Sequence, residues 1–447
     1  MNIKSLLLGS AAALVAVSGA RAADVIVPVA QPEPANYVKV CDVYGSGFYY
    51  IPGTQTCLSI NGYVRLQLNA TGDLSDDAGH HFNTHLDGTD VRNYNAYSQT
   101  RVRLNFDARE ETELGTLRAF ARVQATNKFG SGYNSTNGAN YGMDQGYIQL
   151  GGLTMGYTNS LWTEDNKQWA DGLLTDTDLA LGDQNVNRIS YTYTNAGFAA
   201  ALSVEDSGSG DWKPNVVGRI GYAGGWGYAY IAGSYDEQVN DGNLTYATYT
   251  PTIGAGGIVS SYTYNFGLNP ADRNNGAWAL KAGIDFKDLI ASGSELKIEG
   301  NYAFDPSSYS TIGLFDTTAS TFTTVNGTTT GTFGYGVLGS VPVKWQVGAG
   351  YAQQFGKLGV AVSGAYGKTF ATYGYTTPAI AGGTIARIAD DSSYYKLVGN
   401  VGYEIVKNFS VLGEVRYTNL DLNGTTANNL NGKLDQTSGF LRFVRSF

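Results

Sequence analysis

The chain has 447 residues, of which 38 are acidic and 29 are basic, and its formal net charge is -9. This acidic balance argues against a nucleic-acid-binding protein, which normally presents a basic face. With 59 Gly, 32 Tyr and 18 Phe but only 3 Met, the composition favours strands and turns over the core of an ordinary soluble protein. After the N-terminal segment, no stretch reaches the roughly 18 uninterrupted apolar residues of a membrane-spanning helix, which excludes an inner-membrane helical bundle.

The N-terminus has the pattern of an export signal. Lys4 supplies a positive start, residues 6–17 are mostly apolar, and Ala20-Arg21-Ala22 matches the small-residue cleavage pattern. The alternative is a membrane anchor, but the apolar stretch is short for a span of about 20 residues. We therefore expect residues 1–22 to be a signal peptide that is removed on export.

The exported part contains two cysteines, Cys41 and Cys57. Exported proteins meet an oxidising compartment, so a disulfide between these residues is the default expectation. A pair of free thiols is the alternative. A zinc site is not expected, because no second pair of ligands accompanies the cysteines.

The clearest strand pattern lies in residues 101–109, where apolar and polar side chains alternate. The polar face of this segment carries three arginines: Arg101, Arg103 and Arg109. Successive side chains of a strand point to opposite faces. An arginine near the middle of a lipid-facing surface costs roughly 2–4 kcal/mol, and a slip by one residue would place three of them there. The arginine face is therefore predicted to line a wet interior.

The same alternation recurs to the end of the chain and predicts sixteen strands. Their separators are alternately short and long, with seven short turns and eight long loops, as in an up-and-down transmembrane barrel. A soluble sandwich or propeller is the alternative, but it would need a buried second face, and here that face is polar in almost every strand. The expected strands are 59–70, 97–110, 115–126, 141–151, 152–159, 186–195, 197–206, 213–223, 226–236, 276–286, 294–304, 342–354, 358–368, 393–405, 409–419 and 436–447.

These patterns divide the chain into three parts. The signal peptide is followed by an N-terminal segment, residues 23–57, with the two cysteines, and residues 58–447 form an all-β, 16-stranded antiparallel transmembrane β-barrel. The last strand ends in Gly439, Leu441, Phe443 and Phe447, with Arg445 interrupting the alternation. A terminal aromatic of this kind looks like the recognition signal of the barrel assembly machinery.

Residues 40–58, VCDVYGSGFYYIPGTQTCL, resemble the opening of outer-membrane porins from rhizobia-like alphaproteobacteria. The matching positions are Cys41-Asp42, Tyr44-Gly45, Tyr50 to Thr54, Cys57 and Gly62 to Arg65. The ending, from Gly439 to Phe443 and Ser446-Phe447, is also similar to that family. The resemblance implies a homotrimeric porin of the bacterial outer membrane, in contact with lipid and lipopolysaccharide, for passive diffusion of small hydrophilic solutes and ions.

The resemblance also implies that the third long loop folds inward and narrows the pore. By count this loop is residues 160–184. Its acidic side chains would face a basic wall that three consecutive strands provide, and the opposed charges would set the selectivity of the pore. The basic wall is predicted to consist of Arg65, Arg101, Arg103, Arg118 and Arg122. The acidic side is predicted to consist of Glu164, Asp165, Asp171, Asp176, Asp178 and Asp183.

Two other functions keep the barrel but change its use. A substrate-selective channel, for example for sugars, is suggested by the abundant tyrosines, and a structural or adhesive barrel by the long loops. We find no G-x-S-x-G, Walker A or H-E-x-x-H motif, so an enzyme is not expected. His80, His81 and His85 lie in the first long loop without ordered ligand spacing, and neither a metal nor a cofactor is expected.

Overall fold

Sixteen antiparallel strands form a closed barrel in the part of the chain that the structure describes. The computed structural model describes residues 39–72, 74–76, 81–82, 94–130, 133–134, 141–177, 179, 184–237, 252–253, 259–261, 276–315, 322–325, 328–331, 341–375, 385–389, 391–422 and 432–447. The predicted signal peptide lies outside these residues. The barrel strands are β2 (Cys57–Gly72), β5 (Tyr94–Thr112), β6 (Gly115–Gly130), β8 (Gly142–Leu150), β9 (Leu153–Asn159), β10 (Asn185–Asn195), β11 (Phe198–Glu205), β12 (Asn215–Gly224), β13 (Gly227–Asp236), β16 (Ala277–Lys287), β17 (Ser294–Ala303), β21 (Val341–Phe355), β22 (Leu358–Thr369), β25 (Ser393–Val406), β26 (Phe409–Leu422) and β27 (Gly432–Ser446).

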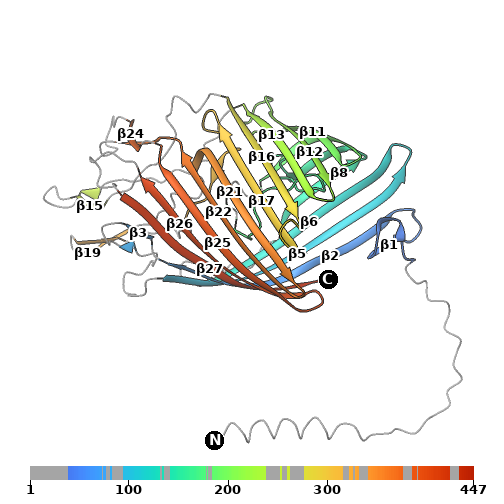
Figure 1. Cartoon of the computed structure of the whole chain (residues 1–447), viewed down its shortest axis with the longest axis horizontal. Coiled ribbons are helices and arrows are strands. Elements are labelled where there is room, and N and C mark those ends of the chain that lie inside the picture. Colours follow the sequence, from blue (N-terminus) through green and yellow to red (C-terminus); the bar gives the residue numbers. More distant parts are fainter. Residues whose placement is uncertain are drawn as a thin grey trace, which may run out of the picture. The chain divides into compact units, whose positions relative to one another are not determined.

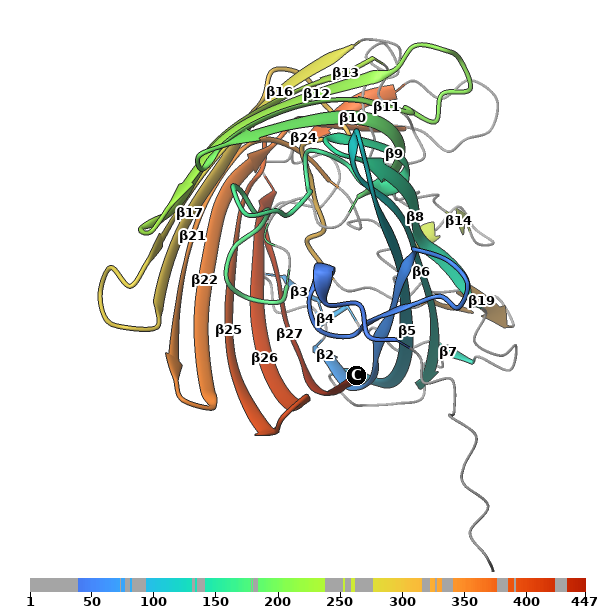
Figure 2. The same ribbon diagram turned by 90° about the vertical axis from the view of Figure 1, so that its right-hand side faces the viewer.

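Each strand pairs with the next one along the chain, and the last strand closes the ring on the first. Val64 of β2 lies opposite Val102 of β5 on one side and opposite Arg445 of β27 on the other. Figure 1 shows the strands from β17 to β27 running side by side, and Figure 2 shows the ring that they complete. Closure matters because an open sheet edge would leave unpaired backbone groups, which a bilayer cannot hydrate. The predicted sixteen-stranded antiparallel barrel is confirmed.

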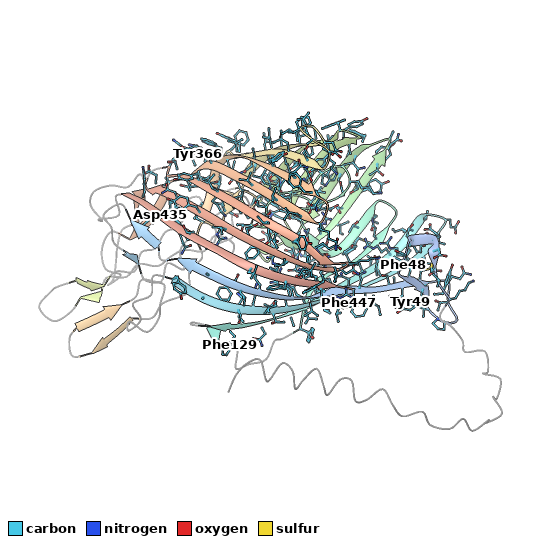
Figure 3. The ribbon with its side chains drawn as sticks, turned by 60° about the horizontal axis from the view of Figure 1, so that its bottom comes forward. Phe48, Tyr49, Phe129, Tyr366, Asp435 and Phe447 are labelled. Atoms are coloured by element: carbon cyan, nitrogen blue, oxygen red, sulfur yellow. A yellow bond between two sulfur atoms is a disulfide. The ribbon has the colours of Figure 1, made fainter. Side chains whose placement is uncertain are left out.

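The two faces of the barrel wall differ as the alternation predicts. On β2, Leu66 and Leu68 point outward and are 43% and 46% exposed, whereas Gln67 between them points inward and is 6% exposed. Phe129 and Tyr366 likewise lie on the outside of the wall (Figure 3). An apolar outer face with a polar inner face is the inverse of a soluble core and suits a wall between lipid and water.

The connections at the two ends of the barrel differ in length. Seven short turns join the strands at one end, and eight longer segments join them at the other. Ala196 and Gly197, between β10 and β11, both have positive φ, at 46° and 85°. Such a pair makes the tight two-residue hairpin whose twist matches that of the flanking strands. The predicted asymmetry of the connections is therefore confirmed.

A disulfide-closed hairpin precedes the barrel. Cys41 and Cys57 form the disulfide, with their Cα atoms 6.0 Å apart, and both side chains are buried with Phe48. The 3-10 turn η1 (Asp42–Tyr44) and β1 (Phe48–Tyr50), which pairs with the start of β2, lie within the closed segment. Figure 3 places Phe48 and Tyr49 at one end of the barrel and Asp435 toward the other. The expected disulfide is confirmed.

The described residues also contain short strands in addition to β1 and the sixteen barrel strands. These strands are β3 (Leu74–Asp76), β4 (His81–Phe82), β7 (Tyr133–Asn134), β14 (Thr252–Ile253), β15 (Val259–Ser261), β18 (Thr311–Ile312), β19 (Phe322–Val325), β20 (Thr328–Gly331), β23 (Thr372–Tyr375) and β24 (Ile385–Ala389). Among the described residues, no helix is long and apolar enough to cross a membrane.

Candidate functional site: the lumen and its third loop

The five predicted arginines share the inner face of three neighbouring strands. Arg65 of β2 lies directly opposite Arg101 of β5, and Arg103 of the same strand lies opposite Gln124 of β6. Arg118 and Arg122 follow on the inner face of β6. Because neighbouring strands are about 4.8 Å apart, these side chains form one continuous wall. We call these five residues the arginine wall.

Acids on the barrel strands themselves accompany part of the arginine wall. Asp107 of β5 accepts paired hydrogen bonds from Arg109 and Arg118, with the closest contacts at 2.7 and 2.9 Å. Asp144 lies 3.3 Å from Arg103 and 3.7 Å from Arg122. A two-pronged guanidinium–carboxylate contact fixes the orientation of the arginine as well as its charge. Part of the wall is therefore held rigidly by its own strands.

Aromatic rings also hold the arginines in place. The Cζ atom of Arg103 lies 5.3 Å from the ring centroid of Tyr63, and that of Arg118 lies 4.9 Å from the ring of Phe120. Such cation–π contacts contribute about 0.5–1 kcal/mol at partly exposed sites. They add to the polar contacts that fix these two side chains on the wall.

The third loop, residues 160–184, is joined to the inner face of the barrel. The described chain after β9 turns into the ring of strands (Figure 2). At its start, the carboxylate of Glu205 accepts hydrogen bonds from the Ser160 hydroxyl at 2.7 Å and from the Leu161 N–H at 2.8 Å. Trp162 and Trp169 are almost completely buried beside β11, β12 and β13.

Buried cations bind the main-chain carbonyls of this loop. Arg219 of β12 donates from Nη1 to the carbonyl oxygens of Leu161 and Glu164 at 3.1 and 3.0 Å. Lys297 of β17 donates to the carbonyl oxygen of Ala170 at 2.9 Å. A charge removed from water needs such partners, because a buried unpaired charge costs several kcal/mol. These cations therefore fix the path of the loop along the wall.

The described loop acids contact cations on strands outside the arginine wall. Glu164 pairs with Arg188 of β10, Asp171 with Lys281 of β16, and Asp176 with Arg442 of β27. Asp165 accepts a hydrogen bond from the Asp171 N–H at 2.7 Å. Burial raises the pKa of Asp165, and the nearby carboxylate of Asp171 raises it further. Asp178 and Asp183 lie outside the described residues.

The tip of the loop reaches the strands on the opposite side of the barrel. Glu414 of β26 accepts hydrogen bonds from the N–H groups of Asp176 and Thr177 at 2.7 and 2.9 Å. Leu174 N–H donates to the Ser363 hydroxyl of β22 at 3.3 Å. The loop therefore spans the lumen from β9 to β26. A cavity of about 210 Å³ between the tip and β2, β26 and β27 is lined by amide, hydroxyl and charged side chains.

Several residues that position the loop were not among the predicted site residues. The alternation places Lys281, Lys297 and Glu414 on the inner face, and the same argument applied to β12 would have placed Arg219 there. The sequence carried no signal that Glu205 would anchor the start of the loop or that Glu414 would anchor its tip. These roles depend on contacts between residues 44 and 238 positions apart.

Comparison with known proteins agrees with this architecture. Residues 24–440 match the family model described as the Porin subfamily. The porin Omp2b of Brucella suis is 35% identical over 324 residues, which cover 64% of this chain and 81% of that protein. Omp2b of Brucella neotomae is 36% identical over 313 residues, with the same coverage.

A solved structure shares the fold. The outer-membrane channel DcaP of Acinetobacter baumannii aligns with a TM-score of 0.53 and 15% identity, covering 89% of this chain and 99% of that one. At this identity the likeness concerns the fold alone. The family match and the Brucella relatives confirm the resemblance to alphaproteobacterial porins. The chain therefore belongs to the porin subfamily and is an outer-membrane porin, and this membership implies a channel rather than an enzyme.

Proposed function

We propose that this channel passes small hydrophilic solutes and ions by passive diffusion through a charged constriction. The arginine wall bounds this constriction on one side, and the third loop bounds it on the other. The charged side chains around the opening and the width of the opening then determine which solutes pass. The channel needs no cofactor for this transport, since solutes move down their own gradients.

The observation that carries the proposal is the partial exposure of the arginine wall opposite a loop that spans the lumen. The side chains of Arg103, Arg118 and Arg122 are 21%, 22% and 25% exposed. Arg65 and Arg101 lie directly opposite each other, and like charges in that position destabilise a sheet unless water or a counter-ion reaches them. These features support a water-filled passage beside the arginines.

The third loop contributes its charges in a different way. Asp176, at the tip, is 35% exposed although it pairs with Arg442. Glu164 and Asp171 are bound to buried cations and serve mainly to hold the loop. We therefore assign Asp176 and the likewise solvent-exposed Asp165 as the described loop acids that are accessible from the passage, with the arginine wall as the dominant charge of the constriction.

Planar-bilayer recording tests the proposal. The purified protein should give large, stepwise conductance, and the Arg101→Glu/Arg103→Glu variant should shift the reversal potential in a salt gradient toward cation preference. A protein that inserts without conducting would refute the channel mechanism. An unchanged reversal potential would place both arginines outside the constriction.

Three partners belong to the proposal through family membership alone. We propose a homotrimer, contact of the outer face with lipopolysaccharide, and insertion by the barrel assembly machinery. The exposed apolar band on the outer face supports a lipid environment. Cross-linking of the protein in native outer membranes would test the trimer directly.

A further inference from the structure

A second loop segment lies buried inside the barrel. Residues 304–315 follow β17 on the same side as the third loop, where loops usually lie at the surface. Tyr309, Ile312 and Leu314 are nevertheless each about 1% exposed. We call residues 307–315, all of which are buried except Gly313, the inner segment. Its burial requires specific partners, because a loop carries backbone polar groups that must be satisfied.

The first half of the inner segment binds two acids at the ends of barrel strands. Asp236, the last residue of β13, accepts hydrogen bonds from the Ser308 N–H at 2.8 Å and from the Ser308 hydroxyl at 2.6 Å. The Tyr309 hydroxyl donates to Glu205 at 2.9 Å. The same Glu205 carboxylate anchors the start of the third loop. One buried acid therefore joins the two loops.

The inner segment also packs directly on the third loop. The rings of Tyr309 and Trp162 meet edge to face, with their centroids 5.9 Å apart. Both side chains belong to one buried cluster with residues of β11, β12, β13 and β16. Aromatic pairs in this arrangement contribute about 0.5–1.5 kcal/mol beyond the area that they bury. The two loops thus form a single packed layer on that wall.

The second half of the inner segment continues along the wall to β25. Ser310 donates to the carbonyl oxygen of Val343 at 2.7 Å, and β18 pairs with the start of β21. Lys396 of β25, which is 2% exposed, donates to the carbonyl oxygen of Gly313 at 2.8 Å. The inner segment is therefore fixed at several points between β13 and β25.

The inward-facing cations of the barrel differ in solvent exposure between the side that the two loops cover and the side that they leave open. Behind the two loops, Arg219, Lys281 and Lys297 are 1%, 5% and 2% exposed. On the other side of the barrel, Arg103, Arg118 and Arg122 of the arginine wall keep about a fifth to a quarter of their side-chain surface open. Water therefore reaches the inner face of β5 and β6 far more than that of β12, β16 and β17.

We propose that the inner segment is a second constriction element. With the third loop it seals the half of the lumen along β12 to β25 and confines solutes to the half beside the arginine wall. This inference rests on the proposed function only in that solutes cross the lumen. Tyr309 and Asp236 act as positioning residues, because they hold the segment in place and are themselves buried.

Releasing the inner segment tests this role. In the Asp236→Ala/Tyr309→Ala variant, both anchors of its first half are lost. We expect single-channel conductance to rise about 1.5-fold or more, since conductance grows with the open cross-section. We also expect the reversal potential to move toward anion preference, because Lys396, which donates to Gly313 of the inner segment, becomes wet. Tyr302→Ala, which changes a tyrosine on the outer face of β17, is the matched control and should leave both values unchanged.

Thiol labelling tests the burial of the segment without disrupting it. Both native cysteines are in the disulfide, so a single introduced cysteine provides the free thiol. In detergent-solubilised, folded protein, Leu314→Cys should resist a water-soluble maleimide, whereas Trp212→Cys, at a fully exposed position, should react rapidly. Equal labelling rates would overturn the proposal.

The two measurements separate this proposal from the proposed function. Unchanged conductance in the double variant, with Leu314→Cys protected, would show that the inner segment does not limit the passage and would overturn its role. If the wild-type protein fails to conduct at all, the channel mechanism fails. The labelling ratio would still decide whether the inner segment is seated in the barrel.

Discussion

Replacing Glu414 should loosen the tip of the third loop. Its carboxylate, 2% exposed on the inner face of β26, accepts hydrogen bonds from two loop N–H groups, and Asn400 donates to it at 3.0 Å. The Thr177 hydroxyl also donates to this carboxylate, so Glu414→Ala leaves four donors without their acceptor. Glu414→Gln keeps one carbonyl oxygen but removes the charge. The two variants therefore form a graded series.

The magnitude follows from the contacts that are lost. A hydrogen bond to a charged group contributes about 1.5–3 kcal/mol, so two of them contribute about 3–6 kcal/mol to holding the tip. Every 1.4 kcal/mol is a factor of about ten in an equilibrium, so even the lower value raises the detached fraction roughly 100-fold. The Asp176–Arg442 pair and the Leu174–Ser363 bond remain, so the loop should fluctuate rather than leave the lumen.

Open-channel current noise reports such fluctuations directly. Noise should increase from the wild-type protein through Glu414→Gln to Glu414→Ala. Glu404→Ala is the matched control, because it removes an exposed carboxylate from β25, the neighbouring strand. If Glu414→Ala is no noisier than Glu404→Ala, the anchoring role assigned to Glu414 is wrong.

Three further predictions concern the wall, the hairpin and the loop charge. Leu68→Arg, on the outer face, should lower the free energy of unfolding in lipid vesicles by about 2–4 kcal/mol, as measured by urea titration. Asn69→Arg, on the inner face, should lower it by less. Equal losses in the two variants would contradict the assigned faces. Cys41→Ser/Cys57→Ser should destabilise the hairpin by about 3 kcal/mol, the entropy expected for a loop of this size; limited proteolysis should then cut residues 42–56 while the barrel resists, and an unchanged cleavage rate would contradict this. Burial makes the pKa of Asp165 higher in the folded protein than in the unfolded chain. The carboxylate therefore destabilises the folded loop when the pH is above the folded-state pKa. This destabilisation is absent when the pH is below the unfolded-state pKa, because the group is then protonated in both states. Acidification should therefore lower current noise more in the wild-type protein than in Asp165→Asn, and parallel pH profiles would refute this assignment.

The barrel could be predicted from the sequence because its main constraint is local. A strand of ten residues contains enough alternation to fix its two faces, and the cost of an arginine in lipid decides which face is wet. Arg101, Arg103 and Arg118 were assigned to the lumen in this way, and the structure places them there. Strand ends differ from the prediction by up to a few residues: β5 and β6 are longer than predicted, and β8 and β11 are shorter.

The loops could not be predicted because their conformation depends on distant contacts. The third loop was expected to fold inward from family resemblance, but no pattern in residues 160–184 names Glu205 or Glu414 as its anchors. The burial of Ser308 and Tyr309 depends equally on Asp236 and Glu205, about 70 and 100 residues earlier in the chain. In paired strands the hydrophobic pattern specifies which residues lie opposite each other. No such pattern in a single sequence specifies the partners of a loop residue.

Arginine and lysine side chains on the inner face have two roles, and their solvent exposure distinguishes the two. Cations behind the loops, such as Arg219 and Lys297, are bound by main-chain carbonyls and have little contact with water, so their removal should destabilise the loops. Cations of the arginine wall keep open surface, so their removal should change which ions pass while the fold persists. The net charge of the chain is negative, yet one wall of the passage carries a group of partly exposed arginines. Selectivity in this porin therefore depends on where the loops leave the lumen open, and the total charge of the chain does not reveal it.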